Sequence, residues 1–373
     1  MISNKVHITI LERNLFSAIF LLTAIGTVVM YSASSMIHPN LPSTHFLFRH
    51  LFWITIGSFF GFLAVLIPME TIKKYSKHIL LISILLIVIG IILNPTTDAA
   101  RWLIYRNGAK QITTSDIGRL ALIIYSAWFF DKYRDKINDV KNVLIPFLII
   151  TGLLLLSIVK QPDMSTTLVF GFIILSLLFI AGLKIKYIFG ILAVCIPLVM
   201  IKIYNTPYMM KRVKDFYNSI FGDQSLVESK DQVGQAIMAM GSAGFLGRGL
   251  GDGILKKGFI PEIQGDFIFS VIGEEFGLMS ELLILCTFGY IFIKGIHLAQ
   301  KATTPFSMFL VLGISLNFIL YVIINVAYVT KLLPTTGLAL PFFSYGGTHT
   351  IINFIMVGLL FNVTQEVKKR HGY

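Results

Sequence analysis

The stretch KLLPTTGLALPFFSYGGTHT, residues 331–350, interrupts one of the most apolar parts of the chain. An apolar run at 304–328 precedes it, and another follows at 345–364. Proline and glycine break helices, and broken backbone is tolerated at membrane depth only where protein or water satisfies its polar groups. The stretch therefore predicts a re-entrant or buried loop that lines a cavity between two membrane-spanning helices.

The composition of the whole chain supports a membrane protein. Of 373 residues, 55% are hydrophobic and only 13% are charged, whereas soluble domains are about 25% charged. Apolar runs of about 20 residues, the length that crosses a bilayer, recur throughout. The sequence predicts an all-α polytopic membrane protein with ten transmembrane helices, at 13–36, 46–69, 77–94, 113–130, 142–160, 165–182, 186–203, 266–293, 304–328 and 345–364.

Positive charge predicts the orientation of these spans. Lys and Arg gather in alternate short connections, around 73–77, 132–141 and 184–186, and at the C-terminal end. Short cytoplasmic loops carry such an excess, so we expect both termini in the cytoplasm. The same rule explains the net charge of +12 without nucleic acid as a partner. We expect one domain over 1–373, with a large extracytoplasmic loop at about 204–265 between helices 7 and 8.

Charged side chains inside or beside the spans are candidate functional residues. Arg119 lies within the fourth span, three residues after Asp116, and is either an anion site or half of an ion pair that holds helices together. Asp163 follows Pro162 and is either a helix cap or a substrate contact. Asp266 lies where the outer loop meets the eighth span, which makes it the exposed candidate for chemistry. Glu274 and Glu275 point elsewhere and are expected to organise the helix bundle.

The outer loop carries two further signals. YMMKRVKDFYNSIF, residues 208–221, is amphipathic and typical of a segment that meets anionic headgroups. The glycine-rich stretch that follows has Arg248, Lys256 and Lys257 beside it, which suits a phosphate-bearing ligand. No His, Cys or Asp spacing of the kind that binds zinc is visible, so we predict no protein metal site.

Several motifs together resemble the SEDS family (shape, elongation, division and sporulation proteins). They are QPDMSTTLV (161–169), GRGLGDG (247–253), GDFIFSVIGEEFG (265–277) and LLPTTGLALPFFSYGGT (332–348), with AARWL and SDIGRLA at 99–103 and 115–121. The resemblance covers about residues 12–365 and favours the division branch over the elongation branch. The chain departs from the family pattern at Gln264-Gly265, at Tyr321, at Ser165 and in the residues before Asp116.

The resemblance implies a peptidoglycan glycosyltransferase that polymerises lipid II, a disaccharide-peptide on undecaprenyl diphosphate, at the outer face of the bacterial plasma membrane. It places the essential acid on Asp266, as general base. The residues expected to bind substrate are Arg101, Arg119, Asp163, Arg212, Arg248, Lys257, Asn325, Ser344, Gly346 and Gly347.

The resemblance also implies partners. These are a class B penicillin-binding protein, which is a transpeptidase, and other division proteins. No cofactor is evident, although Mg²⁺ or Mn²⁺ bridging diphosphate and Asp266 is open. A lipid II flippase and a non-catalytic division scaffold remain alternatives. The position of Asp266 at the outer rim, away from the bilayer midplane, favours surface chemistry over transport.

Overall fold

The computed structural model describes residues 2–34, 42, 44–94, 102–103, 105–106, 109–110, 112–161, 163–221, 232–257, 260 and 263–370. Its first half contains α1 (Ile2–Ser34), α2 (His45–Leu66), α3 (Met69–Leu93), α4 (Thr114–Tyr133), α5 (Ile145–Lys160), α6 (Met164–Ile180) and α7 (Ile185–Tyr204). A π-helix (Val140–Leu144) leads into α5, and β1 (Tyr105–Arg106) pairs with β2 (Ala109–Lys110) in a small hairpin. The second half contains α8 (Pro207–Phe221), α9 (Gln232–Ala243), α10 (Ile268–Lys301), α11 (Pro305–Val329) and α12 (Gly347–Arg370).

Eight helices in the described part of the chain are long and apolar enough to cross a membrane. Seven of them lie within α1, α2, α3, α7, α10, α11 and α12, and the eighth, Val140–Lys160, joins the π-helix to α5. The other two predicted spans fall on α6, which is apolar but has 17 residues, and on α4, which carries Asp116 and Arg119. A multi-pass α-helical membrane protein is thus confirmed, while the count of ten spans stays a prediction.

Some helix ends differ from those predicted. The prediction started the third span at 77, but α3 begins at Met69 because Pro68 separates it from α2. The last helix continues past the predicted 364 to Arg370, since its final turn is basic and favoured at a helix C-terminus. Polar extensions of this kind carry no hydropathy signal.

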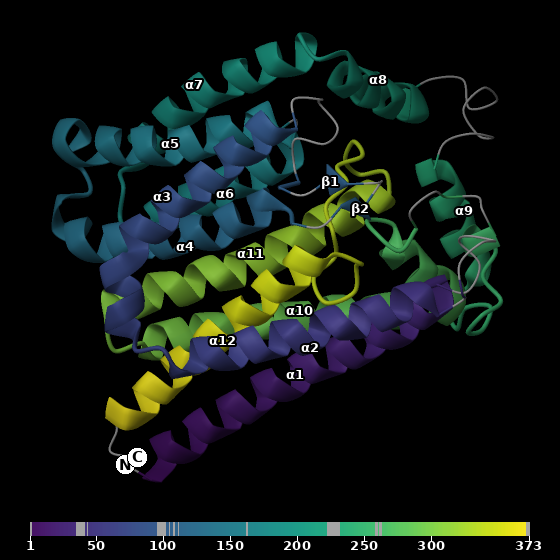
Figure 1. Cartoon of the computed structure of the whole chain (residues 1–373), viewed down its shortest axis with the longest axis horizontal. Coiled ribbons are helices and arrows are strands. Elements are labelled where there is room, and N and C mark those ends of the chain that lie inside the picture. Colours follow the sequence, from purple (N-terminus) through teal and green to yellow (C-terminus); the bar gives the residue numbers. More distant parts are fainter. Residues whose placement is uncertain are drawn as a thin grey trace.

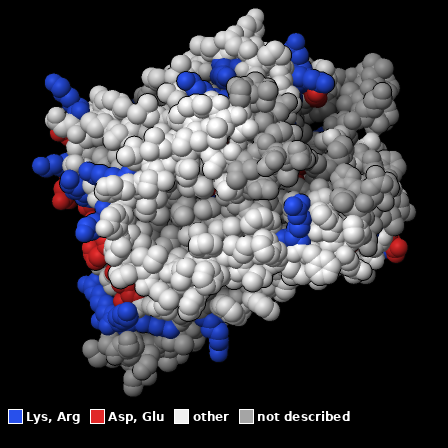
Figure 2. Space-filling view, in the orientation of Figure 1, with Lys and Arg blue, Asp and Glu red and all other residues white. Residues whose placement is uncertain are grey.

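Both ends of the chain lie at the same end of the helical bundle, at the lower left of Figure 1. Lys and Arg gather over that end, whereas the middle of the visible surface is almost free of charge (Figure 2). We call the opposite end, which carries α8, α9 and the β1–β2 hairpin, the outer end. This arrangement agrees with the prediction that both termini lie on one side of the membrane.

Glycines allow α2 and α12 to pack closely. A Cβ atom on Gly61 would lie 2.6 Å from the carbonyl oxygen of Phe354, and one on Gly358 would lie 2.1 Å from the carbonyl oxygen of Gly61. Small residues permit such close backbone contact between helices. In a bilayer this van der Waals packing helps to hold helices together, because the hydrophobic effect does not drive their association there.

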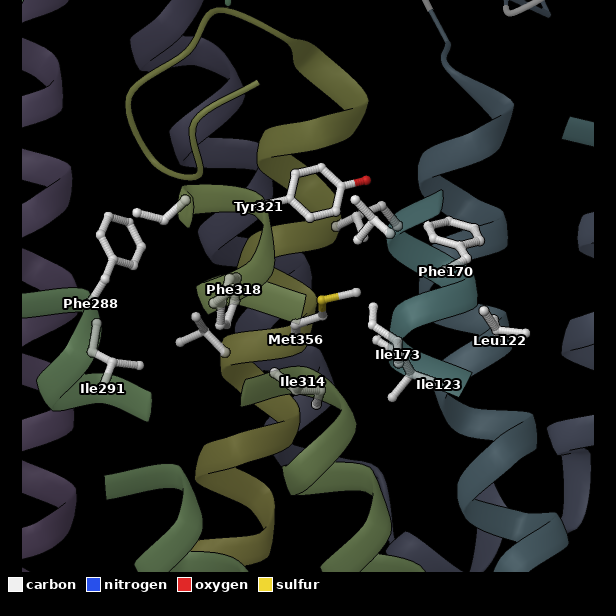
Figure 3. Close-up of a cluster of buried hydrophobic side chains, with 14 of the residues drawn as sticks. Leu122, Ile123, Phe170, Ile173, Phe288, Ile291, Ile314, Phe318, Tyr321 and Met356 are labelled. Atoms are coloured by element: carbon white, nitrogen blue, oxygen red, sulfur yellow. The ribbon is translucent and has the colours of Figure 1, made fainter. Parts of the chain in front are cut away.

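Figure 3 shows one cluster of the apolar side chains that fill the interior of the bundle. The labelled members are Leu122 and Ile123 of α4, Phe170 and Ile173 of α6, Phe288 and Ile291 of α10, Ile314, Phe318 and Tyr321 of α11, and Met356 of α12. In contrast, α7 has no buried residue, although every other predicted span has some. The hydrophobic core as a whole has members on α1 to α6 and on α9 to α12, with α7 at the periphery.

The eighth predicted span is not a continuous helix. Gly277 interrupts α10 with φ 75° and ψ −179°, a conformation open mainly to glycine. Residues 244–249 of the outer loop fill the gap with main-chain hydrogen bonds. Arg248 and Gly249 donate to the carbonyls of Glu274 and Glu275 at 2.9 and 3.0 Å, while Leu278 and Met279 donate to those of Gly244 and Phe245 at 3.2 and 3.3 Å.

Candidate functional site

Asp266 lies in the turn that leads into α10, at the outer end of the bundle. The side chains of Asn325 and Tyr328, both on α11, donate hydrogen bonds to its main-chain carbonyl, the former at 3.0 Å. Asn325 is fully buried, whereas Asp266 is partly exposed. Side chains of α11 thus fix the main chain of Asp266, while its own side chain remains near the surface.

The predicted broken loop is present between α11 and α12, and it enters the bundle. Lys331 and Phe342 have positive φ values of 57° and 67°, and Leu338, Leu340 and Phe343 are buried. The main-chain N–H of Tyr345 donates to the carbonyl of Gln264 at 2.8 Å, which fastens this loop to the turn that carries Asp266.

Side chains from three helices hold the part of this loop at Thr335–Leu338. Arg212 Nη1 of α8 donates to the carbonyl of Thr335 at 2.8 Å, and Ser165 Oγ of α6 donates to that of Thr336 at 2.8 Å. Asn325 of α11 donates to the carbonyl of Leu338 at 2.6 Å. The Thr335–Leu338 segment is therefore positioned by contacts between elements far apart in sequence.

This segment lies beside the carboxylate of Asp266. A Cβ atom on Gly337 would lie 3.3 Å from Asp266 Oδ2, and Gly337 itself is exposed with φ +72°. The absence of a side chain at this position leaves the carboxylate accessible from the outer end. Arg212 binds the carbonyl of Thr335, two residues before Gly337, and so brings a cation to the same region.

Arg212 comes from the amphipathic segment, which is helical as α8. Its guanidinium lies 4.4 Å from the centre of the Tyr208 ring and also donates to the Tyr208 hydroxyl. The side chain is only partly buried, so it contacts the loop and still faces the outer end. Of the predicted site residues, Asp266, Arg212 and Asn325 all lie against the Thr335–Leu338 segment, and Asp266 and Arg212 are the charged ones.

Arg119 is fully buried. Its Nη2 atom lies 3.3 Å from Asp116 Oδ1 and donates to Asn353 Oδ1 at 3.0 Å, and its guanidinium lies 4.5 Å from the Tyr321 ring. His349 Nδ1 contacts the same Asp116 oxygen at 3.3 Å. This geometry favours the ion-pair interpretation over a direct anion contact, because the contacts of Arg119 join α4, α11 and α12 away from the surface.

Asp163 is also a largely buried structural residue. It caps α6 by accepting from the N–H of Thr166 at 3.3 Å, and Ser115 donates to its other oxygen at 3.3 Å. One carboxylate oxygen of Asp163 thus caps α6 and the other binds Ser115, which favours the cap interpretation over a substrate contact.

The remaining predicted site residues of the broken loop serve its packing. Ser344 is buried and accepts from the N–H of Leu340 at 2.7 Å. A Cβ atom on Gly347 would lie 2.6 Å from the Trp53 ring. The carbonyl of Gly346 accepts from the N–H of Thr350 at 2.9 Å, in the first turn of α12. These contacts shape the loop without reaching Asp266.

Three further basic residues were predicted to bind substrate: Arg101, Arg248 and Lys257. Arg248 is exposed and donates to Ser242 at 2.7 Å. Arg101 lies outside the described residues, as does the side chain of Lys257. Their proposed contacts with substrate stay predictions.

Glu274 and Glu275 were expected to organise the helix bundle, and the structure shows that they mainly hold the outer loop against it. Glu274 accepts from the N–H groups of Ile254 and Leu255 at 2.6 and 3.1 Å. Glu275 pairs with the buried Lys256 at 2.9 Å and accepts from Ser32 of α1 at 2.7 Å. Paired and hydrogen-bonded charges of this kind can remain ionised when buried.

No group of three or more His, Cys, Asp or Glu side chains suited to a metal ion occurs within the described ranges.

Sequence reasoning missed the positioning contacts. Tyr328, His349 and Asn353 were not singled out, although His349 and Asn353 stand four residues apart in an apolar helix, which places them on one face. Ser165 was noted only as a departure from a family pattern. Its contact with Thr336 spans 171 residues and has no local signal.

Comparison with known proteins identifies the family. The family model described as "Cell cycle protein" (FtsW, RodA, SpoVE) matches residues 12–369. A probable peptidoglycan glycosyltransferase FtsW from Trichlorobacter lovleyi is 34% identical, covering 93% of this chain and 91% of its own length. The corresponding protein from Aliivibrio salmonicida is 31% identical, covering 92% and 86%.

Solved structures share the fold. A chain from a study of how a peptidoglycan synthase complex coordinates polymerization and crosslinking has a TM-score of 0.76 at 20% identity, over 95% of this chain and 97% of that one. Thermus thermophilus RodA, a rod shape determining protein, has a TM-score of 0.66 at 19% identity, over 94% and 96%. With a family model that matches nearly its whole length, this chain belongs to the FtsW/RodA/SpoVE family of cell cycle proteins.

Proposed function

We propose that this protein is a peptidoglycan glycosyltransferase that polymerises lipid II at the outer face of the bacterial plasma membrane during septal wall synthesis. The observation that carries the proposal is a partly exposed carboxylate, Asp266, at the outer end of an apolar helical bundle, beside an open glycine and a loop held by Arg212. The relatives named FtsW, at about a third identity over most of the chain, support it.

The proposed chemistry needs one base and a stabilised leaving group. Asp266 takes the proton from the 4-hydroxyl of one lipid II sugar, whose oxygen forms a bond to the anomeric carbon of another lipid II. The bond from that carbon to the diphosphate breaks, and undecaprenyl diphosphate leaves. Arg212 offsets the charge that develops on the diphosphate. Its guanidinium is suited to this because it presents several donors in a plane.

The other predicted residues divide into two groups. Arg101, Arg248 and Lys257 remain candidates for contact with substrate. Arg119, Asp163, Asn325, Ser344, Gly346 and Gly347 act on the substrate indirectly, by holding the loop and helix ends around Asp266; their hydrogen bonds and close contacts to protein atoms support this division.

A divalent cation and a partner protein complete the proposal. Asp266 would help to hold Mg²⁺ or Mn²⁺ when substrate is bound, and the cation would offset negative charge on the leaving diphosphate. The rate of polymerisation after EDTA treatment and after titration of either ion tests this. The partner is a class B penicillin-binding protein, which crosslinks the new strand. The fold shared with a chain from a study of a peptidoglycan synthase complex that polymerises and crosslinks supports such an assembly.

The test is polymerisation of purified lipid II by the full chain, reconstituted with its class B partner and with transpeptidation blocked. Wild type is compared with Asp266→Asn and with the matched control Asp215→Asn, an exposed aspartate of α8. Long glycan from wild type and the control, but none from folded Asp266→Asn, is the expected result.

Other outcomes are equally informative. Glycan from all three proteins would keep the function and remove Asp266 as its essential base. No glycan from any of them, with the complex intact, would contradict the enzyme proposal. A fluorescent lipid II translocation assay on the same vesicles would then test the flippase alternative, and a negative result there would leave a scaffold.

A further inference from the structure

The outer loop presents large apolar side chains beside the break in α10. Phe245 and Leu246 are 68% and 83% exposed, yet the main chain on both sides of them is fixed by the hydrogen bonds to Glu274, Glu275, Leu278 and Met279. Two adjacent exposed apolar residues on a hydrogen-bonded loop point to an apolar surrounding, since contiguous exposed apolar surface marks an interaction site.

That surrounding is suggested by the neighbours of these residues. The carbonyl of Phe245 accepts from the N–H of Met279. Leu278 and Met279 begin the lipid-facing part of α10, where Leu282 and Leu283 are also exposed. Before the break, residues Ile268–Glu275 are all buried in protein. The exposed loop residues are therefore continuous with the side of α10 that faces lipid.

The depth of the break can be estimated from the helix length. Lys294 marks the inner boundary of the hydrocarbon, because ammonium groups stay at the interface. A core of about 30 Å takes about 20 residues at 1.5 Å each, which puts the outer boundary near residue 274. Gly277 then lies a few ångströms inside the hydrocarbon, and any tilt of the helix moves it deeper.

The hydrogen bonds across the break fit this depth. Unpaired main-chain groups are costly in hydrocarbon, so an interrupted helix persists there only if another segment satisfies it. Residues 244–249 supply that satisfaction with four main-chain hydrogen bonds. For this they must reach the level of the break.

We propose that residues 244–249 form a re-entrant loop that inserts Phe245 and Leu246 among the acyl chains of the outer leaflet. The loop and the buried first part of α10 then set the height of the candidate carboxylate. Nine residues, or about 14 Å of helix, separate Ile268 from Gly277, and Asp266 lies two residues before Ile268, which places it in the headgroup region or just above.

The experiment uses the full chain in vesicles of phosphatidylethanolamine and phosphatidylglycerol, without a partner. The exposed Cys195 and Cys286 are replaced by Ser, and a nitroxide label is attached at Leu246→Cys. Leu282→Cys on the lipid-facing part of α10 is the hydrocarbon control, and Asp252→Cys, exposed on the same loop, is the water control. Power saturation compares access of oxygen with access of a water-soluble nickel complex.

We expect oxygen to reach the label at position 246 and the nickel complex to be excluded from it. The label at position 282 should behave in the same way, whereas the label at position 252 should be accessible to nickel. Nickel access equal to that at 252 would overturn the proposal, and the patch would then be a surface for a protein partner. If Leu246→Cys fails to fold, a label at Phe245→Cys gives a second reading. Folding of every variant is checked by comparing its melting temperature in detergent with that of wild type.

Discussion

Asn325 binds the main chain of Asp266 and that of Leu338 with the same side-chain amide, at 3.0 and 2.6 Å. One buried side chain thus sets the candidate base and the adjacent loop relative to each other. Asn325→Asp keeps the shape, removes the donor and faces two carbonyl oxygens with a carboxyl group. A buried hydrogen-bond partner lost in this way costs about 1–3 kcal/mol.

We expect Asn325→Asp to abolish most polymerisation, measured as glycan formed per folded protein. The control is Asn317→Asp, the same change at another buried position of α11, whose amide contacts Met356 and not the Asp266 turn. Both variants should lose melting temperature in detergent. Equal activity losses per folded molecule would show that the contact with Asp266 has no special role.

Ser165 supports the site through its hydroxyl group. Ser165→Ala removes the hydrogen bond to Thr336, worth about 1 kcal/mol, and should lower kcat several-fold with little change in KM for lipid II. Ser165→Thr keeps a hydroxyl and should restore the rate. The matched control is Ser157→Ala in α5, whose hydroxyl only bonds back to Leu153 of its own helix. An unchanged kcat in Ser165→Ala would contradict the positioning role.

The Arg119–Asp116 pair should behave as a buried ion pair. Arg119→Met leaves a carboxylate without its main cation and should cost about 3–5 kcal/mol of unfolding free energy. Asp116→Leu in the same chain removes that charge, so the double variant should recover part of the loss. Denaturation in mixed micelles measures both. A double variant less stable than Arg119→Met would mean that Asp116 is held mainly by His349.

Gly277 should tolerate no side chain. At φ 75° a Cβ atom would lie 2.3 Å from the Gly247 nitrogen and 2.4 Å from the Phe245 oxygen, so Gly277→Ala should destabilise by more than about 1 kcal/mol. Gly289→Ala, later in α10, has nothing within 4 Å of the new atom and should be neutral or stabilising. Melting in detergent compares the two. A neutral Gly277→Ala would mean that α10 can close into one helix.

The sequence was most informative where the bilayer restricts the structure. Apolar length predicted the spans, and the spacing of Asp116 and Arg119 predicted their pairing, because both depend on local geometry. The amphipathic helix α8 and the broken loop after α11 were recognised for the same reason. Asp266 was assigned to the end of a span on its position and on family resemblance, and its catalytic role stays a prediction.

The contacts that position the site could not be read in the same way. Ser165 meets Thr336, and Arg212 meets Thr335, only after the whole bundle has assembled. The break at Gly277 was missed because a single glycine is compatible with a continuous helix when no partner strand is known. What distinguishes it is the loop at 244–249, which lies about 30 residues earlier in the chain.

Helix α7 has no buried residue. Selection on such a segment acts mainly through its affinity for lipid, since few neighbouring side chains require a particular shape. Its apolar residues can exchange for one another during evolution far more freely than those of α12, which packs against α2 at backbone distance. Sequence drift among relatives should therefore concentrate in α7, and a substitution there carries little information about catalysis.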